Sequence, residues 1–495
     1  MRACAILVGV IVLAGCSHDD PPPVVTPDSG TLLSCPASEK PVGTSGLTTG
    51  VFQLGPFKVG QTVGFDVPAN TASITIVQQA VSAPDSVTLT NPTGALNNTA
   101  VPLIVKEPGG KTVFDDNQSH PTDPSDLTVF FASESPATGT LTIPNTTAGL
   151  ALVGPSGLPA GRWSFIVSDF AYECTSPAAS PLPFGLTCQS GNDQSIYDVT
   201  VITKPTAGGA IQASGKLDVA IYFATTVGGG AAGWAAPLDA DKANAGTDPD
   251  LKRMETALGK LFAQANIQLG AVKYTLLPAD VLATYATGVD IDQSGACAPL
   301  AQLLRSSDSG NTLNIFFVSA FRVSGLQGGN TVVGVDGTIP GPSSIGGTVA
   351  SGAAVATLDL RARSGTAVCS DLNLNLQCGA DTTAYIIAHE AGHFLGLYHV
   401  IEAEGTLFDP ISDTATCPCS TCASATSRAH CADASPRPAT GTEHLMTVAE
   451  CSQSQTACGG GTNLMFWRLD SSSSVGLLTD QQNSVLRANP LIQTP

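Results

Sequence analysis

The stretch "AHEAGHFLGLYH", residues 388–399, places three histidines, one glutamate and two glycines close together in the chain. The whole chain has only seven histidines among its 495 residues, so nearly half of them lie in this stretch. Such a concentration of a scarce residue restricts the local fold, because each imidazole needs a hydrogen-bond partner or a metal ion if it is buried.

The residues before this stretch predict a helix. Asp381, Thr382 and Thr383 are candidate N-caps that precede an apolar stripe. Gly396 is the predicted stop, because glycine adopts the left-handed conformation that commonly ends a helix. We therefore expect a helix that ends near Gly396 and a chain that turns there.

This helix predicts a metal site. His389 and His393 are four residues apart, so their imidazoles project from one face of a helix at chelating distance. The turn at Gly396 brings His399 back as a third nitrogen ligand, and Glu390 lies next to the first ligand without being a ligand itself. Three protein ligands with one open position are typical of catalytic zinc, whereas structural zinc sites usually have four ligands. We therefore predict Zn²⁺ as a cofactor.

The alternative is a chance HExxH match in which the histidines are hydrogen-bonded and hold no metal. Short matches of this kind are common, so the motif alone is weak. Here the pattern extends to H-E-x-x-H-x-x-G-x-x-H, and every fixed position is filled. The longer pattern favours the metal site.

The extended motif resembles the signature of the metzincin zinc peptidases. Metzincins also have a Met-turn, whose methionine packs beneath the metal ligands. The two candidates are Met446 in "EHLMTV" and Met465 in "TNLMFW". We prefer Met465 because the segment "LTDQQNSVLRANP" follows it and predicts a closing helix, in which Thr479 and Gln482 fit a capping box.

Within the metzincins, the segment "HEAGHFLGLYH", the cysteine-bearing loop after it, "DPISDTATC" and "NLM" are similar to the pappalysin branch, including its ulilysin-like bacterial homologues. The resemblance implies that His389, His393 and His399 bind zinc and that Glu390 is the general base of peptide hydrolysis. One departure is Trp467, which stands where that branch tends to have an aromatic hydroxyl shortly after the Met-turn.

The same resemblance implies Ca²⁺ as a candidate second cofactor, because relatives in this branch bind calcium. Asp409 and Asp413 are the candidate oxygen ligands. The alternative is that the two carboxylates cap turns in a solvated loop.

The N-terminal segment "MRACAILVGVIVLAGC" has one early cation, a short apolar run and small residues before Cys16. Its apolar run is too short to span a bilayer. The segment "LAGC" resembles the lipobox of bacterial lipoproteins, which implies that Cys16 carries the lipid. The alternative is an ordinary signal peptide. The lipoprotein interpretation predicts a chain anchored to the bacterial cell envelope, at the outer membrane or cell surface, or released from it.

The cysteine count fits an exported protein. Setting aside Cys4 and Cys16 leaves an even number of the 14 cysteines, which in an oxidising compartment indicates disulfides. Candidate local pairs are Cys174 with Cys188 and Cys369 with Cys378. The alternative for one cluster is a zinc knot formed by Cys417, Cys419, Cys422 and Cys431.

Composition and hydrophobic patterning predict a multidomain chain. Short alternating apolar runs such as "TVGFDVP", "ASITIVQQ", "LTVFFAS" and "GRWSFIVSDF" favour an antiparallel β-sandwich. Beyond it, strands such as "LDVAIYFAT" alternate with helices such as 248–266, which indicates an α/β layer of the metzincin type. The predicted parts are a signal peptide at 1–15, a tether at 16–34, the sandwich at 35–203, a linker at 204–216 and the peptidase domain at 217–495.

The formal net charge of −19 argues against a nucleic-acid partner. We therefore predict a zinc-dependent endopeptidase that acts on extracellular proteins or peptides. Two alternatives stay open at this point. One is a surface-anchored binding protein or adhesin with a β-sandwich module and a weakly active or inactive peptidase-like domain. The other is a zinc hydrolase that acts on a non-peptide amide.

Overall fold

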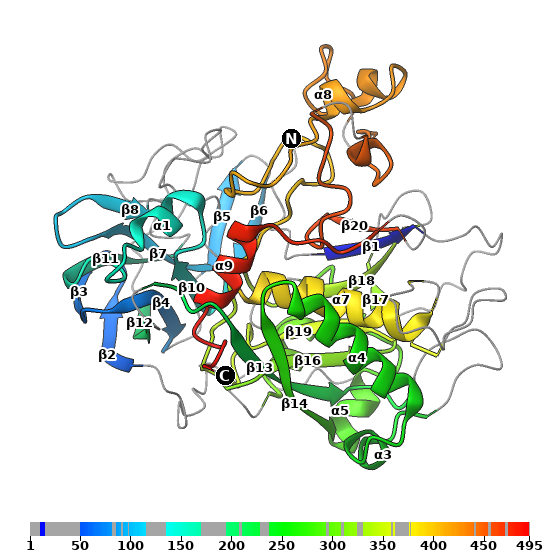
Figure 1. Ribbon diagram of the computed structural model, residues 1–495, viewed down its shortest axis with the longest axis horizontal. Helices are drawn as coiled ribbons and strands as arrows, with labels where there is room; N and C mark the ends of the chain where they lie inside the picture. Colours follow the sequence, from blue (N-terminus) through cyan, green and yellow to red (C-terminus); the bar gives the residue numbers. More distant parts are fainter. Residues whose placement is uncertain are drawn as a thin grey trace.

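The computed structural model describes most of the chain from residue 50 onward, together with one short N-terminal segment (Figure 1). The described residues are 10–14, 50–81, 86–90, 93–97, 99–114, 135–169, 195–206, 210–227, 237–293, 297–307, 311–323, 330–357, 360–361, 376, 378–439, 442–453, 457–470 and 474–494.

The first folded unit is a β-sandwich, as the sequence predicts. Its four-stranded antiparallel sheet has the order β10 (Thr138–Ile143), β4 (Thr71–Ala80), β12 (Ile196–Pro205) and β2 (Gly50–Lys58). The opposing sheet contains β3 (Thr62–Val67), β11 (Gly161–Asp169), β7 (Thr99–Lys106), β8 (Thr112–Phe114) and β9 (Ser135–Pro136). A hairpin of β5 (Ser86–Thr90) and β6 (Thr93–Asn97) and the short helix α1 (Thr147–Leu152) complete it.

The core of the sandwich lies between these two sheets. Phe65 and Phe165 of one sheet are buried in one cluster with Ile76 and Val201 of the other. The alternation in β3 and β11 explains this arrangement, because every second side chain of a strand points to the same face. The predicted strand "LTVFFAS" lies outside the described residues.

The second unit is an α/β layer. Its seven-stranded sheet has the order β14 (Ile267–Leu276), β13 (Gly215–Phe223), β16 (Leu313–Val318), β19 (Ala353–Ala356), β18 (Asn330–Asp336), β1 (Val10–Ala14) and β20 (Arg468–Leu469). The first four strands are parallel, and β18 runs antiparallel to β19. A small parallel pair, β15 (Val289–Asp290) and β17 (Phe321–Arg322), forms a separate sheet.

Helices cover both faces of this sheet. On one face, α4 (Pro249–Ala263) and α7 (Gly379–Phe394) bury their apolar side chains in the largest core cluster. On the other face, α5 (Ala279–Thr284) and α6 (Pro299–Leu304) contribute to a smaller cluster. The short helix α3 (Ala240–Asn244) precedes α4, and α9 (Asp480–Ala488) closes the chain. The fold class predicted from the sequence, a sandwich followed by an α/β unit, is therefore confirmed.

The predicted start of α7 is wrong. The helix begins at Gly379, before all three candidate caps, and Cys378 is its N-cap without a side-chain hydrogen bond. Asp381 instead accepts two hydrogen bonds from the guanidinium of Arg253 on α4, at 2.7 and 2.8 Å. This buried ion pair explains the difference, because it uses the carboxylate to join two helices rather than to cap one.

The segment predicted as a signal peptide lies mostly outside the described residues. Its residues Val10–Ala14 form β1, which pairs antiparallel with β18 and parallel with β20. β18 and β20 meet only through β1 in the sheet order. If the segment is cleaved during export, the β18 edge becomes free to pair with another extended chain. Among the helices of the described residues, none has the length and hydropathy needed to cross a membrane.

The sandwich packs directly against the α/β unit through α9, which lies between the two in Figure 1. Lys204, in β12 of the sandwich, is 4% exposed, and its Nζ donates hydrogen bonds to the carbonyl oxygens of Arg487, Asn489 and Ile492 at 2.6–2.9 Å. The carbonyls of Arg487 and Asn489 lie at the C-terminal end of α9, where the helix dipole favours a cation, and that of Ile492 lies just beyond it. One buried side chain therefore links the two units.

We expect Lys204 to make stability depend on pH. Burial, with a smaller contribution from Arg487, lowers the pKa of Lys204 from 10.5 to about 7. Between these values the unfolded chain binds more protons than the folded chain, so the free energy of unfolding rises with pH, by at most about 1.4 kcal/mol per pH unit. Urea unfolding of the wild type and Lys204→Met between pH 6.5 and 9 measures this rise, which the variant should lack. Parallel pH profiles for the two proteins would contradict the expectation.

Candidate metal centre

The structure brings His389, His393 and His399 together in one cluster. Their Nε2 atoms face one another at separations of 3.1 Å for His389 with His393 and 3.2 Å for each of these with His399. All three side chains are buried. The first two come from consecutive turns of α7, and the third comes from the chain after the helix ends.

Hydrogen bonds at the other ring nitrogen fix the tautomer of each imidazole. His389 Nδ1 donates to the carbonyl oxygen of Leu464 at 2.7 Å, and His393 Nδ1 donates to that of Leu397 at 2.8 Å. His399 Nδ1 lies 3.2 Å from both carboxylate oxygens of Glu402. Because these partners only accept hydrogen bonds, a neutral imidazole at each position carries its proton on Nδ1 and presents a lone pair at Nε2.

The surroundings keep the helical imidazoles neutral. Burial, reinforced by the neighbouring imidazoles, lowers the pKa of His389 and of His393 well below the usual value. A neutral imidazole is the form that binds metals. Three lone pairs therefore meet in a buried space without a proton between them, which is unfavourable unless a cation joins them.

The three nitrogens fit a zinc ion. A tetrahedral zinc at Zn–N distances of roughly 2.0–2.1 Å separates its nitrogen ligands by about 3.3–3.4 Å. The observed separations of 3.1–3.2 Å are close to this requirement. Three ligands also leave one of four positions open, which is the arrangement of catalytic rather than structural zinc.

Gly396 ends the helix as the sequence predicts. Its φ of +111° is the positive value that favours glycine. The N–H of Gly396 donates to the carbonyl of His393, and the N–H of Leu397 donates to that of Gly392, which together form a Schellman motif. This turn reverses the chain, so that His399 faces the helix that carries the other two histidines.

Of the two candidate methionines, Met465 lies next to the triad. A Cβ atom added at Gly392, between the two helical histidines, would lie 2.4 Å from Met465 Sδ, so the absence of a side chain there makes room for the methionine. The neighbouring residue, Leu464, accepts the hydrogen bond of His389. Met446 is also buried, but it packs against Gly405 in a separate loop.

Glu390 lies on α7 beside the first histidine, facing strand β18. Its two carboxylate oxygens are buried and have no hydrogen-bond partner among the described residues. A Cβ atom at Gly334 of β18 would lie 2.2 Å from one of them, so a larger residue there would displace this carboxylate. Burial, with a smaller contribution from Asp336, raises the pKa of Glu390 well above its usual value.

Asp336 and Glu402 were not identified from the sequence. Asp336 is two residues beyond Gly334 and therefore shares its face of β18, and burial raises its pKa well above the usual range. The spacing of three residues between His399 and Glu402 could have indicated the contact, because such residues can meet across a turn.

Asp409 and Asp413 are both engaged in protein hydrogen bonds. Asp409 accepts a hydrogen bond from Thr414 Oγ1 at 2.5 Å, and burial raises its pKa to about 8. Asp413 accepts one from the backbone N–H of Gln481, in the first turn of α9, at 2.9 Å. Neither belongs to a metal-ligand cluster of the described residues.

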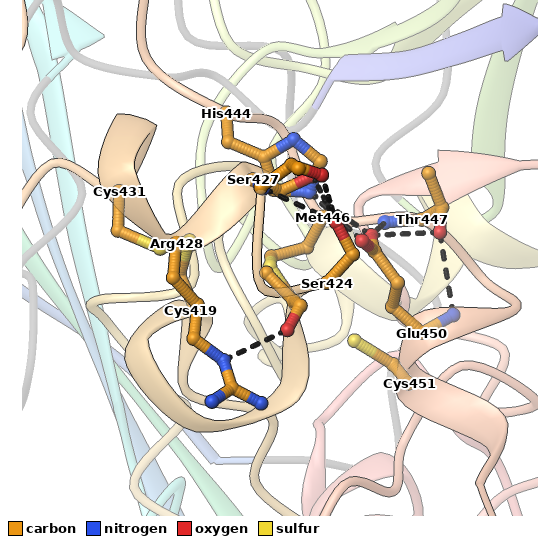
Figure 2. A network of polar contacts seen from close by, with 12 residues as sticks. Cys419, Ser424, Ser427, Arg428, Cys431, His444, Met446, Thr447, Glu450 and Cys451 are labelled. Atoms are coloured by element: carbon orange, nitrogen blue, oxygen red, sulfur yellow. Dashed lines mark hydrogen bonds and ion pairs between the residues drawn. A yellow bond between two sulfur atoms is a disulfide. The ribbon is translucent and has the colours of Figure 1, made fainter.

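The cysteines after the triad form disulfides and not a zinc knot. The pairs are Cys417–Cys451, Cys419–Cys431 and Cys422–Cys458. These cysteines lie in one segment, residues 417–458, which we call the disulfide-bonded loop. It includes α8 (Cys419–Cys422), η2 (Ser427–His430) and η3 (Glu450–Ser452), and Figure 2 shows part of it. Cys297 and Cys378 are also disulfide-bonded. The other predicted partners, Cys174, Cys188 and Cys369, and the predicted lipid site, Cys16, lie outside the described residues.

The sequence matches one known protein family. Residues 220–465 match metallo-peptidase family M12, in its reprolysin-like form. The match begins in β13 and ends at Met465, so it contains most of the α/β layer and the whole triad. Among curated proteins the chain has no match.

We expect Gly396→Ala to weaken metal binding, because alanine strains the turn that delivers His399. Gly246→Ala is a matched control: Gly246 also has a positive φ, of +66°, and neither glycine has an atom within 3.4 Å of an added Cβ. Both variants should lose about 1 kcal/mol or more of stability. Titration with Zn²⁺ against a chelator should show weaker binding only for Gly396→Ala, and equal affinities in the two variants would contradict the role of the turn.

Proposed function

We propose that this chain, whose residues 220–465 match metallo-peptidase family M12, is a zinc-dependent endopeptidase that hydrolyses extracellular proteins or peptides. His389, His393 and His399 are the proposed zinc ligands, and Glu390 is the proposed general base. The observation that carries the proposal is the convergence of three buried imidazoles beside a buried carboxylate.

When bound at the three Nε2 atoms, zinc supplies a Lewis acid toward a water molecule and a peptide carbonyl. The chain's own residues supply the proton transfers. Glu390 has no protein hydrogen bond that would compete for its oxygens, and its raised pKa favours accepting a proton from water. The same carboxyl group then returns the proton to the leaving amine.

Strand β18 is the proposed site for the peptide substrate. It passes over Glu390 at Gly334, so a peptide paired with its edge would run past the carboxylate. The antiparallel pairing of β1 with β18 supports this, because it demonstrates that an extended segment fits at that edge. A substrate strand could replace this segment after its removal.

We further propose the pappalysin-like branch of the metzincins, with Met465 as the Met-turn residue. The "HEAGHFLGLYH" segment followed by a disulfide-bonded loop supports this assignment. Trp467 remains a departure from that branch. Its Nε1 donates to the carbonyl oxygen of Met446 at 2.9 Å, so this side chain is engaged in packing the loop.

A lipid anchor at Cys16 and a location at the bacterial cell envelope are also proposed. The "LAGC" sequence supports the anchor, and the disulfides support export to an oxidising compartment. Calcium binding at Asp409 and Asp413 stays a prediction, with helix capping and turn formation as the alternative roles of these carboxylates.

Glu390→Gln should abolish most of the peptidase activity while zinc binding is retained. Glutamine has nearly the same shape but does not accept the proton, and general-base catalysis typically contributes about 10²–10⁴-fold in rate. Cleavage of a peptide library by the mature protein, with zinc content measured on the same samples, gives both readouts.

Chelator treatment followed by zinc addition is the control, because it should remove and then restore the wild-type activity. A zinc-loaded wild type that cleaves no peptide would contradict the proposal. That result would favour the binding protein or a hydrolase of non-peptide amides.

Cys16→Ser should release the protein from membranes. The thiol is the proposed attachment point, and serine does not form the thioether. Membrane fractionation of cells that express each protein, with incorporation of labelled fatty acid as a second readout, measures the effect. Equal labelling of the two proteins would contradict the anchor.

A further inference from the structure

One histidine of the triad differs from the other two in its hydrogen-bond partner. His389 and His393 donate their Nδ1–H groups to backbone carbonyls. His399 faces the carboxylate of Glu402, with both oxygens 3.2 Å from Nδ1. The imidazole of His399 is 2% exposed and the carboxylate 20% exposed, so the pair lies at the boundary between the buried triad and solvent.

A tight turn holds the carboxylate in this position. Ile401 and Phe408 form an antiparallel bridge, and within it the N–H of Glu402 donates to the carbonyl oxygen of Leu407. The N–H of Gly405 donates back to the carbonyl oxygen of Glu402 at 2.8 Å. Both backbone groups of Glu402 are therefore hydrogen-bonded, which fixes the position of its Cα atom and the direction of its side chain.

The disulfide-bonded loop holds this turn from the other side. The N–H of Met446 donates to the carbonyl oxygen of Ala403 at 2.8 Å, and that of Cys419 donates to the carbonyl oxygen of Gly405 at 3.1 Å. Gly405 has a φ of +64°, and a Cβ there would lie 2.8 Å from Met446 Cγ. In Figure 2, Met446 lies between Cys419 and the side chains of Thr447 and Glu450.

We propose that Glu402 is a positioning residue for the third zinc ligand. Its carboxylate orients the His399 ring, fixes the tautomer that exposes the Nε2 lone pair and increases the electron density on that nitrogen. The inference rests on the proposed function, because it assumes that the triad binds zinc. Glu402 lies outside the zinc-binding motif, and the hydrogen bonds from the disulfide-bonded loop keep its turn in place.

The physical reason lies in the position of His399 outside the helix. His389 and His393 are oriented by α7, whereas His399 follows a turn and depends more on its own hydrogen bond. Loss of the carboxylate leaves the ring free to rotate and its Nδ1–H without an acceptor. Removal of such an outer partner typically lowers metal affinity by about 10–100-fold.

Zinc affinity is the direct test, measured with the full mature protein by competition between Zn²⁺ and a chromophoric chelator. Glu402→Ala should weaken zinc binding by about 10-fold or more, and Glu402→Gln should weaken it less, because its amide oxygen accepts the same hydrogen bond without the charge. The absorption spectrum of the Co²⁺-substituted protein should change in Glu402→Ala and be largely restored in Glu402→Gln.

Glu450→Gln is the matched control. Glu450 pairs with a histidine of the same loop, His444, at 3.0 and 3.1 Å, but it touches no residue of the triad. This variant should keep its zinc affinity within about twofold. Circular dichroism and thermal unfolding of the metal-free variants check that each is folded.

The outcomes separate this inference from the proposed function. A wild type that binds zinc tightly together with an equally tight Glu402→Ala variant overturns the role of Glu402 alone. Equal losses in Glu402→Ala and Glu450→Gln also overturn the role of Glu402, because they would show that zinc affinity depends on the loop as a whole and not on the Glu402 carboxylate. A wild type that binds no zinc would overturn the proposed function and this inference with it.

Discussion

Three imidazole lone pairs converge in a buried space, and the arrangement of the surrounding chain depends on keeping them there. Each Nδ1 atom faces an acceptor, so the Nε2 atom of each neutral imidazole presents its lone pair to the other two rings. Burial opposes a charge on His389 and His393. Without a cation, such a cluster would be unfavourable, and this requirement links the fold to the chemistry.

Each acceptor comes from a different part of the chain. Leu464 precedes Met465, Leu397 follows the turn at Gly396, and Glu402 belongs to a turn clamped by the disulfide-bonded loop. The ligands on α7 are held by the burial of that helix against α4 and the central sheet. A local motif of eleven residues therefore depends on tertiary contacts that extend over much of the α/β unit.

The sandwich is also part of this assembly. Its strand β12 carries Lys204, which binds the end of α9, and Asn489 just after that helix donates from its side chain to the carbonyl oxygen of Leu395 at the end of α7. A short series of contacts thus leads from the sandwich to the helix that holds two of the histidines. This packing argues for a sandwich that supports the α/β unit rather than a freely tethered module.

The sequence predicts what local patterns encode. The triad, the turn at Gly396, α9 with its capping box and the alternation of strands and helices all depend on residues close together in the chain, and they were predicted. The start of α7 was missed because Asp381 pairs with Arg253, which is distant in sequence. Strand β18, Asp336 and Glu402 were missed for the same reason: their roles arise from contacts that only the tertiary structure creates.

X-ray absorption at the zinc edge of the metal-loaded protein tests the central claim most directly. Three imidazole ligands predict three nitrogen scatterers at roughly 2.0–2.1 Å with the ring pattern of histidine, a further light-atom ligand, and no sulfur. Sulfur at about 2.3 Å, or fewer than three imidazoles, would place the metal elsewhere and contradict the account.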